Sequence, residues 1–386
     1  MQIYLDRSAT TKPRPEAIAL AQQVMSQQWG NPSSLHGWGQ QAATRLEAAR
    51  IQVASSIHAA PESIVFTSGG TEADNLAILG IVRKYQTPQH IIISSVEHSA
   101  IAKPVEILER QGWQITRLPV NCQGRVEPLD LQAAIRSNTV LVSIIYGQSE
   151  VGTLQPIDRL ARIARARGIP FHTDAVQVAG CLPINVEQLG VDLLSLSGHK
   201  IYGIKGAGAL YVRSGIELVP LLSGGGQELE LRSGTQAVPA IAALGIAAEL
   251  AAAEMSAEVP RLMALRDRLF DRLADCTCLI PTGDRLYRLP HHVSFVLSDR
   301  LAASDVTGKT IVRQLNLAGI GISAGAACHS GKLNPSPILL AMGYSEATAK
   351  RGIRLTIDRE TTTADIDWTA MVLKQILSRL MPLVCC

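Results

Sequence analysis

Short apolar runs alternate with longer stretches of helical spacing between residues 63 and 212. The apolar runs, each of a length typical of a buried strand, are 63–67, 90–94, 140–145, 169–174, 191–196 and 208–212. Helical spacing fills most of the intervals, at 72–84, 100–111 and 157–167. Strands that alternate with helices usually pair in parallel, because each helix carries the chain back to the same end of the sheet. The pattern predicts an α/β fold with a mostly parallel sheet covered by helices.

The pattern changes after about residue 255. A charged helical stretch, strand-like runs and further helices follow in turn, at 261–275, 292–297, 308–317, 354–357 and up to residue 383. This order is typical of a smaller α+β unit. A chain of 386 residues is also longer than one small domain requires. We expect a large domain over 15–257 and a small domain formed by 1–14 and 258–386.

Composition excludes several classes of function. A net charge of +3 and an aromatic content of 4% argue against binding to nucleic acid or to a membrane surface. The Ala-rich stretch 237–253 contains glutamates, so we expect a packed helix and no membrane span. Residues 1–6 lack the basic and apolar regions of a secretory leader, which favours the cytoplasm. Seven cysteines at irregular spacing predict neither a disulfide framework nor a metal site.

Lys200 follows the apolar run 191–196, where an ammonium group is costly unless it has a partner or a covalent role. Ser197 and His199, which can both hydrogen-bond, flank it, and Asp174 ends another apolar run. Active sites of parallel sheets form at the carboxyl ends of the strands. A lysine that binds pyridoxal 5′-phosphate (PLP) as a Schiff base, with an aspartate that keeps the pyridine nitrogen protonated, fits this pair. For Asp174 alone, a helix cap or a surface ion pair is the commoner role.

The segment 67–75 has the composition of a strand end, a glycine turn and a helix start, with Gly70 and Thr71 at the turn. Such a junction can bind an anion through free backbone N–H groups. It lacks a Walker-type lysine and GxGxxG spacing, so it suits a single phosphate better than a nucleotide, with a plain capped turn as the alternative. His98 could stack on the PLP ring and move protons. Gln177 could donate to the phenolic oxygen of PLP.

Two further residues in the second half of the chain carry candidate chemistry. Cys328 lies among small residues in the segment 323–331, which favours an accessible thiol that acts as a nucleophile. A small buried cysteine in a packing loop is the alternative. Arg354 begins a strand-like run, and its guanidinium suits a substrate carboxylate. A structural ion pair is equally compatible with its position.

Together these motifs resemble, essentially end to end, the cysteine desulfurases of the NifS/IscS type, within the class V aminotransferase superfamily of fold-type I PLP enzymes. Besides the Cys328 segment, the resemblance rests on the motifs at 4–6, 9–11, 30–36, 66–72, 96–99, 173–177, 195–200, 224–228, 232–235 and 352–354. It implies a large domain with a mostly parallel seven-stranded sheet and a smaller α+β domain. It also implies that sulfur is removed from L-cysteine to give L-alanine and a persulfide on Cys328. The sulfur would pass to iron–sulfur cluster assembly or to another acceptor.

The resemblance also implies a role for each matching residue. Lys200 would be the Schiff-base lysine, Cys328 the nucleophile, and His98 the group that stacks on PLP and moves protons. Residues that would hold the cofactor are Gly70, Thr71, Ser149, Asp174, Gln177, Ser197 and His199. Thr235 would reach the cofactor phosphate of a partner subunit, which implies a homodimer with shared sites. Asn31 and Arg354 would hold the carboxylate of the substrate.

The chain departs from the family pattern at three positions. Ser149 stands where many relatives have an asparagine that contacts PLP, Arg7 replaces a common asparagine, and Asp358 replaces a common glycine. None of these changes removes an essential group. A PLP-dependent C–S lyase or a selenocysteine lyase remains the alternative function, and Cys328 favours sulfur transfer over both.

Overall fold

A computed structural model describes residues 2–298, 306–325 and 334–380 of the chain. Its largest sheet has seven strands in the order β2-β8-β7-β6-β5-β3-β4, and all neighbours except those of β8 pair in parallel. The strands are β2 (Ile64–Thr67), β3 (His90–Ser94), β4 (Gln114–Leu118), β5 (Thr139–Ser143), β6 (Phe171–Asp174), β7 (Leu193–Ser197) and β8 (Gly208–Val212). The predicted α/β class and seven-stranded sheet are confirmed.

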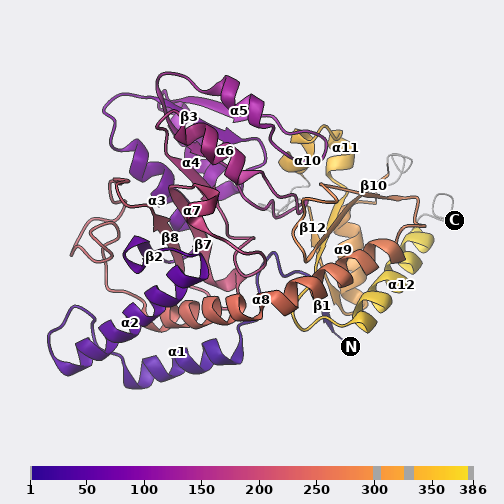
Figure 1. The fold of residues 1–386 in the computed structure, drawn as a ribbon. Coiled ribbons are helices and arrows are strands. Elements are labelled where there is room, and N and C mark those ends of the chain that lie inside the picture. Colours follow the sequence, from indigo (N-terminus) through magenta and orange to yellow (C-terminus); the bar gives the residue numbers. More distant parts are fainter. Residues whose placement is uncertain (1, 299–305, 326–333, 381–386) are drawn as a thin grey trace.

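Helices cover both faces of this sheet (Figure 1). They are α1 (Pro15–Gln27), α2 (Gly37–Ser56), α3 (Gly70–Val82), α4 (Ser99–Arg110), α5 (Pro128–Ala134), α6 (Ile157–Arg165), α7 (Val186–Leu189) and α8 (Val238–Arg272). Strand β3 shows why both faces are apolar: Ile91 and Ile93 pack in the core beneath α3 and α4, whereas Ile92 packs in the core beneath α2, α6 and α8. A strand buried on both sides can therefore carry apolar residues on both faces.

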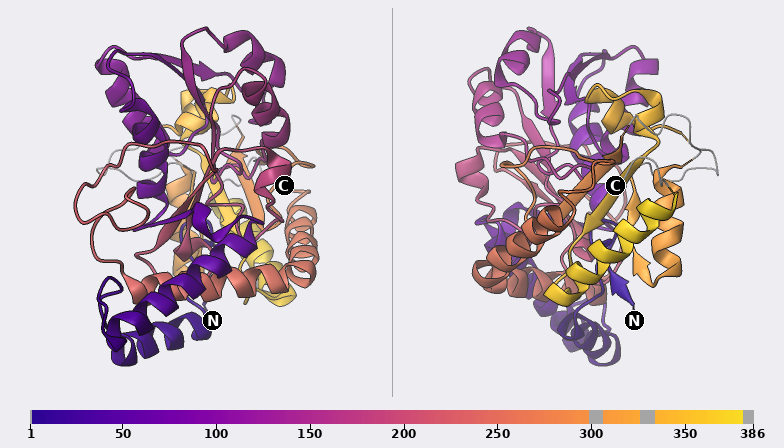
Figure 2. Two further views of the ribbon diagram at one scale, coloured as in Figure 1. Left: turned by 60° about the vertical axis from the view of Figure 1, so that its left-hand side comes forward. Right: turned by 90° about the vertical axis from the view of Figure 1, so that its right-hand side faces the viewer.

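A second unit packs its own core beside this sheet (Figure 2). Its main sheet is antiparallel, in the order β12-β13-β10-β9, and β1 pairs in parallel with β11. The strands are β1 (Ile3–Tyr4), β9 (Leu279–Pro281), β10 (His292–Leu297), β11 (Ile320–Gly321), β12 (Ser323–Ala324) and β13 (Gly352–Thr356). The helices are α9 (Gly308–Leu317), α10 (Pro337–Ala341), α11 (Glu346–Ala349) and α12 (Thr363–Leu380). The separate cores support 15–257 and 1–14 with 258–386 as the proposed domains.

Helix α8 differs from the sequence expectation in two respects. The patterns at 237–253 and 261–275 indicate separate helices, but α8 continues through Pro260 and crosses the proposed domain boundary. By length and composition α8 is also apolar enough to cross a membrane, although its glutamates suggested that it is too polar to do so. Half of its most apolar window is buried, and α8 packs along α1 and α2. Packing inside the protein accounts for its apolarity.

The N-terminal segment connects the two units at the edge of the large sheet where the parallel strands end. The N–H of Thr356 donates to the carbonyl of Leu5 in the small unit (2.7 Å). The N–H of Thr11 then donates to the carbonyl of His199 in the large unit (2.9 Å). The segment between these two contacts therefore passes over the carboxyl ends of the strands, where the candidate residues were predicted.

Candidate active site

Lys200 lies where the sequence predicts it, in the short 3-10 turn Gly198–Lys200 that follows β7. Its Nζ donates to the carbonyls of Ser8 (2.5 Å) and Ala9 (2.7 Å) in the N-terminal segment. Burial, reinforced by the nearby Arg354 guanidinium, lowers the pKa of Lys200 from 10.5 to about 8. A lysine with this pKa has a sizeable uncharged, nucleophilic fraction near neutral pH.

Asp174, at the end of the neighbouring strand β6, faces His98 and a second buried acid, Asp74. One ligand atom from each of the three side chains lies within 4.8 Å of the others. Burial raises the pKa of Asp174, whereas His98 and, less strongly, Lys200 lower it. Asp174 Oδ1 accepts the N–H of Val176 at 2.9 Å. The strand ends thus bring a lysine, a histidine and a buried carboxyl together, as predicted.

The N-terminus of α3 forms a narrow gap beside β7. A Cβ added at Gly70 would lie 2.8 Å from Val176 Cγ2 and 3.4 Å from the Cβ of Ser197. Thr71 follows on the exposed side of the turn. Because the first N–H groups of a helix have no partner within it, α3 offers donors at this gap. The predicted phosphate residues Gly70 and Ser197 are therefore neighbours.

Gln177 and His199 are held by the N-terminal segment. Gln177 Nε2 donates to the carbonyl of Ser8 at 2.9 Å, and His199 Nδ1 lies 3.0 Å from Thr10 Oγ1. Burial, with a smaller effect of Lys200, lowers the pKa of His199 to about 4, so its ring is neutral near pH 7. A neutral ring can donate one hydrogen bond and accept one.

Arg354 extends from β13 toward the same edge. Its Nη2 donates to Asp6 Oδ1 at 2.7 Å, and its Nη1 donates to the carbonyl of Ser149 at 3.1 Å. Its Nε is buried without a hydrogen-bond partner among the described residues. His292 also contacts the Ser149 carbonyl, at 3.0 Å. The contacts recorded for Ser149 therefore involve its carbonyl, whereas the resemblance pointed to its side chain.

Three predicted residues are not brought to this edge by the described chain. Asn31 is exposed in the loop between α1 and α2, which projects at the lower left of Figure 1, and its Oδ1 accepts the N–H of Ser33 at 2.9 Å. Thr235 is exposed in the long connection between β8 and α8. Cys328 lies outside the described residues. Ser323, which precedes it in the chain, pairs with Arg354 across β12 and β13.

The class-V aminotransferase family matches residues 3–368 of the chain. The chain belongs to this family. It is 42% identical to the cysteine desulfurase IscS of Dictyoglomus turgidum (strain DSM 6724 / Z-1310), over 98% of this chain and 95% of the relative. Among solved structures, it is similar to a NifS-like protein with a TM-score of 0.91 and 32% identity, over 98% of this chain and 100% of that one. Its similarity to SspA in complex with cysteine has a TM-score of 0.81 and 35% identity, over 92% of this chain and 99% of that one. The level of identity places this class-V aminotransferase among the cysteine desulfurases.

Class-V aminotransferases are PLP enzymes, and the residues of this one fit that cofactor. The gap at Gly70, which a Cβ would fill, leaves the backbone of α3 open to a phosphate. Asp174 provides a buried acceptor for a ring N–H, and Lys200 provides the amine for covalent attachment. Two buried oxygens at this edge, Asp74 Oδ1 and Glu97 Oε2, have no hydrogen-bond partner among the described residues. The edge therefore contains polar atoms whose hydrogen bonds the described chain does not supply.

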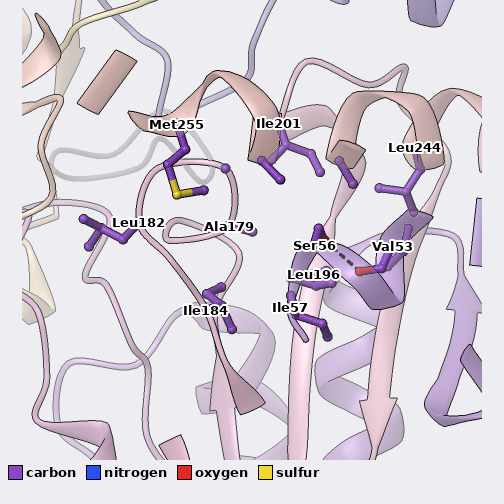
Figure 3. Close-up of a pocket in the computed structure, with 13 residues that line it drawn as sticks. Val53, Ser56, Ile57, Ala179, Leu182, Ile184, Leu196, Ile201, Leu244 and Met255 are labelled. Carbon is purple, nitrogen blue, oxygen red and sulfur yellow. Dashed lines mark hydrogen bonds between the residues drawn. The ribbon is translucent and has the colours of Figure 1, made fainter. Parts of the chain in front are cut away.

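A small cavity of this class-V aminotransferase is a packing feature and not a binding site. Figure 3 shows it between α2, α8 and the segment 179–184, lined by apolar side chains except for Ser56. The Ser56 hydroxyl donates to the carbonyl of Val53 at 2.7 Å. The cavity volume of about 10 Å³ is at the lower limit for one water molecule.

Sequence reasoning missed Asp74 as a site residue. Within 70–82, the buried positions Ala73, Ala77, Ile78 and Ile81 mark the face of α3 that packs on the sheet, and Asp74 belongs to the same face. An acid on an apolar helix face is costly unless it has a specific partner. The acidic side chain of Asp74 on this apolar face was the sequence signal that could have identified it as a site residue.

Proposed function

We propose that this protein is a PLP-dependent cysteine desulfurase that converts L-cysteine to L-alanine and leaves a persulfide on Cys328. The observation that carries the proposal is the position of Lys200. Its amine, with a pKa lowered to about 8, ends a strand beside the buried carboxyl of Asp174. The cysteine desulfurases similar to this chain over almost its full length support the substrate and the reaction.

PLP, when bound, supplies an electron sink for the electron pair left at the substrate Cα. Lys200 would hold the cofactor covalently and, once released, would take the proton from Cα. Asp174 would keep a proton on the pyridine nitrogen, and His98 would stack on the ring and assist proton transfer. Gln177 would donate to the phenolic oxygen of the cofactor. The phosphate would be held by Gly70, Thr71, Ser197 and His199.

Arg354 would bind the substrate carboxylate by exchanging its present carboxylate partner. The ion pair between Arg354 and Asp6 (2.7 Å) already presents a carboxylate oxygen to the guanidinium. Its buried Nε offers a further donor. Substrate binding would therefore replace one charge-assisted hydrogen bond with another, at little cost in desolvation. In the present arrangement Ser149 contributes its carbonyl to hold Arg354 in place.

Cys328 would take the sulfur. Its thiolate attacks the sulfur of the substrate, so that an S–S bond forms and the Cβ–S bond of the substrate breaks. The electron pair of the broken bond stays with the carbon skeleton, which gains protons and leaves as L-alanine. The balance is one L-cysteine and one thiol in, one L-alanine and one persulfide out, with no external oxidant.

Product analysis tests this function. The protein with PLP and L-cysteine should yield alanine, and the Cys328 peptide should gain the mass of one sulfur atom. Cys328→Ala should keep the cofactor absorbance and lose both products, whereas Cys122→Ala, at an exposed free cysteine, should retain them. Pyruvate and ammonia in place of alanine would identify a C–S lyase, and normal alanine production by Cys328→Ala would exclude the thiol as nucleophile.

We further propose a homodimer in which Thr235 and Asn31 serve the site of the partner subunit. Both residues are exposed on this chain. The loop that holds Asn31 also exposes Trp29 (67%) and Leu35 (93%), and Trp38 (57%) is exposed in the adjoining first turn of α2. Exposed large apolar side chains gathered on one loop are typical of a protein interface. The pairing would supply the substrate and phosphate contacts that the described chain lacks at its own site.

Hybrid dimers test this arrangement. Lys200→Ala and Thr235→Val subunits would be co-expressed with different affinity tags and the mixed dimer isolated. If Thr235 serves the partner, the mixed dimer has one complete site and regains about half of the normal activity. A mixed dimer no more active than either parent, or a monomer in sedimentation, would contradict the shared site.

The sulfur acceptor is proposed to be an iron–sulfur scaffold protein in the cytoplasm, because relatives at about 40% identity are IscS-type enzymes. A pull-down with the persulfide form and transfer of ³⁵S from the protein to the scaffold would test it. Failure of transfer with normal alanine production would leave the desulfurase reaction intact and point to another acceptor.

A further inference from the structure

Asp74 on α3 lies behind the site with no role in the steps above. Its side chain is almost fully buried, with 1% of the residue exposed. Its Oδ1 has no hydrogen-bond partner among the described residues. Its carboxyl nevertheless lies within 4.8 Å of a ligand atom of Asp174 and of His98. A buried acid in this position either repels Asp174 or carries a proton.

The surroundings of the two acids differ. Asp174 accepts the N–H of Val176 (2.9 Å) and feels the charge of His98 and Lys200, all of which favour its ionised form. Burial raises the pKa of Asp74, and the neighbouring carboxyls of Asp174 and Glu97 raise it further, with Ser195 as the one neighbour that lowers it. The asymmetry assigns the negative charge to Asp174 and the proton to Asp74.

The nearest base to Asp74 cannot neutralise it. His172 Nε2 lies 3.7 Å from Asp74 Oδ1. Burial lowers the pKa of His172 to about 3, so its ring is uncharged near pH 7. His172 is instead fixed by Ser143 (2.8 Å) and Ser195 (3.0 Å). Two neighbouring buried carboxylates do not both remain ionised when the nearby positive charges favour only one of them, here Asp174.

We propose that Asp74 is a positioning residue that holds a proton and donates it to Asp174, so that the pair presents one negative charge to the cofactor ring. A donor to the ionised form stabilises that form, which keeps Asp174 a carboxylate throughout the working pH range. The inference rests on the proposed role of Asp174 toward PLP. It gives Asp74 a task that its burial and its unpartnered oxygen otherwise leave without explanation.

The first experiment uses the protein without cofactor, so its outcome does not depend on the proposed function. Infrared difference spectra against pH detect the carbonyl stretch of a protonated buried carboxyl. Asp74→Asn should remove one such band. Glu97→Gln is the matched control, because the buried Glu97 has a pKa raised to about 8 and can contribute a band of its own. If Asp74→Asn removes no band near neutral pH, Asp74 is ionised and the proposal is overturned.

The second experiment follows the visible absorbance of bound PLP against pH. The amide of Asp74→Asn can still donate to Asp174, so its titration should match the wild type. Asp74→Ala removes the donor and should move the titration midpoint. Equal displacement by both variants would contradict a donated proton. If Asp74→Ala does not fold, a displaced midpoint in Asp74→Asn alone overturns the proposal.

A metal-binding measurement on the cofactor-free protein tests the alternative that these side chains hold a metal ion. Stoichiometric binding of Zn²⁺ or Mg²⁺ that is lost in Asp74→Asn would overturn the proposal in favour of a metal site.

Discussion

The lowered pKa of Lys200 predicts unusual reactivity of this amine in the cofactor-free protein. With a pKa of about 8, about one molecule in ten carries an uncharged Lys200 at pH 7. An ordinary lysine with a pKa of 10.5 would be uncharged in about three molecules in ten thousand. Burial, the main cause, should therefore raise the reactive fraction of Lys200 about 300-fold at neutral pH.

Competitive labelling with a limiting amount of an amine reagent measures this fraction. The extent of labelling of the Lys200 peptide is followed by mass spectrometry from pH 6 to pH 11, with exposed Lys205 as the internal reference. Labelling of Lys200 should rise with a midpoint of about 8. If the Lys200 curve overlies that of Lys205, burial does not perturb the amine and the reasoning fails.

Two variants separate the electrostatic contributions to Lys200. Arg354 lowers the pKa of Lys200 and Asp174 raises it. Arg354→Gln should therefore move the labelling midpoint upward, and Asp174→Asn should move it downward. Shifts in the same direction, or no shift in either variant, would show that the lysine does not sense these two charges.

Two further predictions concern the support of the site. Tyr202→Phe removes the hydroxyl that donates to the buried Asp358 carboxylate (2.6 Å), which should cost about 1–3 kcal/mol of unfolding free energy in urea; an unchanged urea midpoint would contradict this cost. Gly208→Ala would place a Cβ 2.6 Å from the backbone of Gly69 at the start of α3, which should cost about 1–3 kcal/mol and weaken PLP retention. Gly37→Ala, with no atom within 4 Å of the added Cβ, is its control and should change neither property.

Strands whose two faces are both buried and apolar could be predicted from the sequence. A strand that is partly exposed could not. The strand β3 is buried at every position, and its three central residues, 91–93, form a continuous apolar run. The strand β4, at the edge of the sheet, is exposed or half-buried at four of its five positions and was not predicted. The site could be located because parallel strands end at one edge, which brings Lys200 and Asp174 together. No local pattern showed that the carbonyls of Ser8 and Ala9 would bind Lys200, since that contact depends on how the N-terminal segment crosses the sheet.

Two of the departures from the family pattern, Arg7 and Asp358, both contact the side chain of Tyr202, although they lie at opposite ends of the chain. The guanidinium of Arg7 lies 5.2 Å from the centre of the Tyr202 ring, and the Tyr202 hydroxyl donates to Asp358. Arg7 also donates to Cys181 Sγ at 2.9 Å, so this buried cation contacts two elements of the large unit. A buried cation and a buried anion on one aromatic side chain compensate each other's desolvation. Because Arg7 immediately precedes Ser8, whose carbonyl binds Lys200, the compensated pair also fixes the segment that positions the amine.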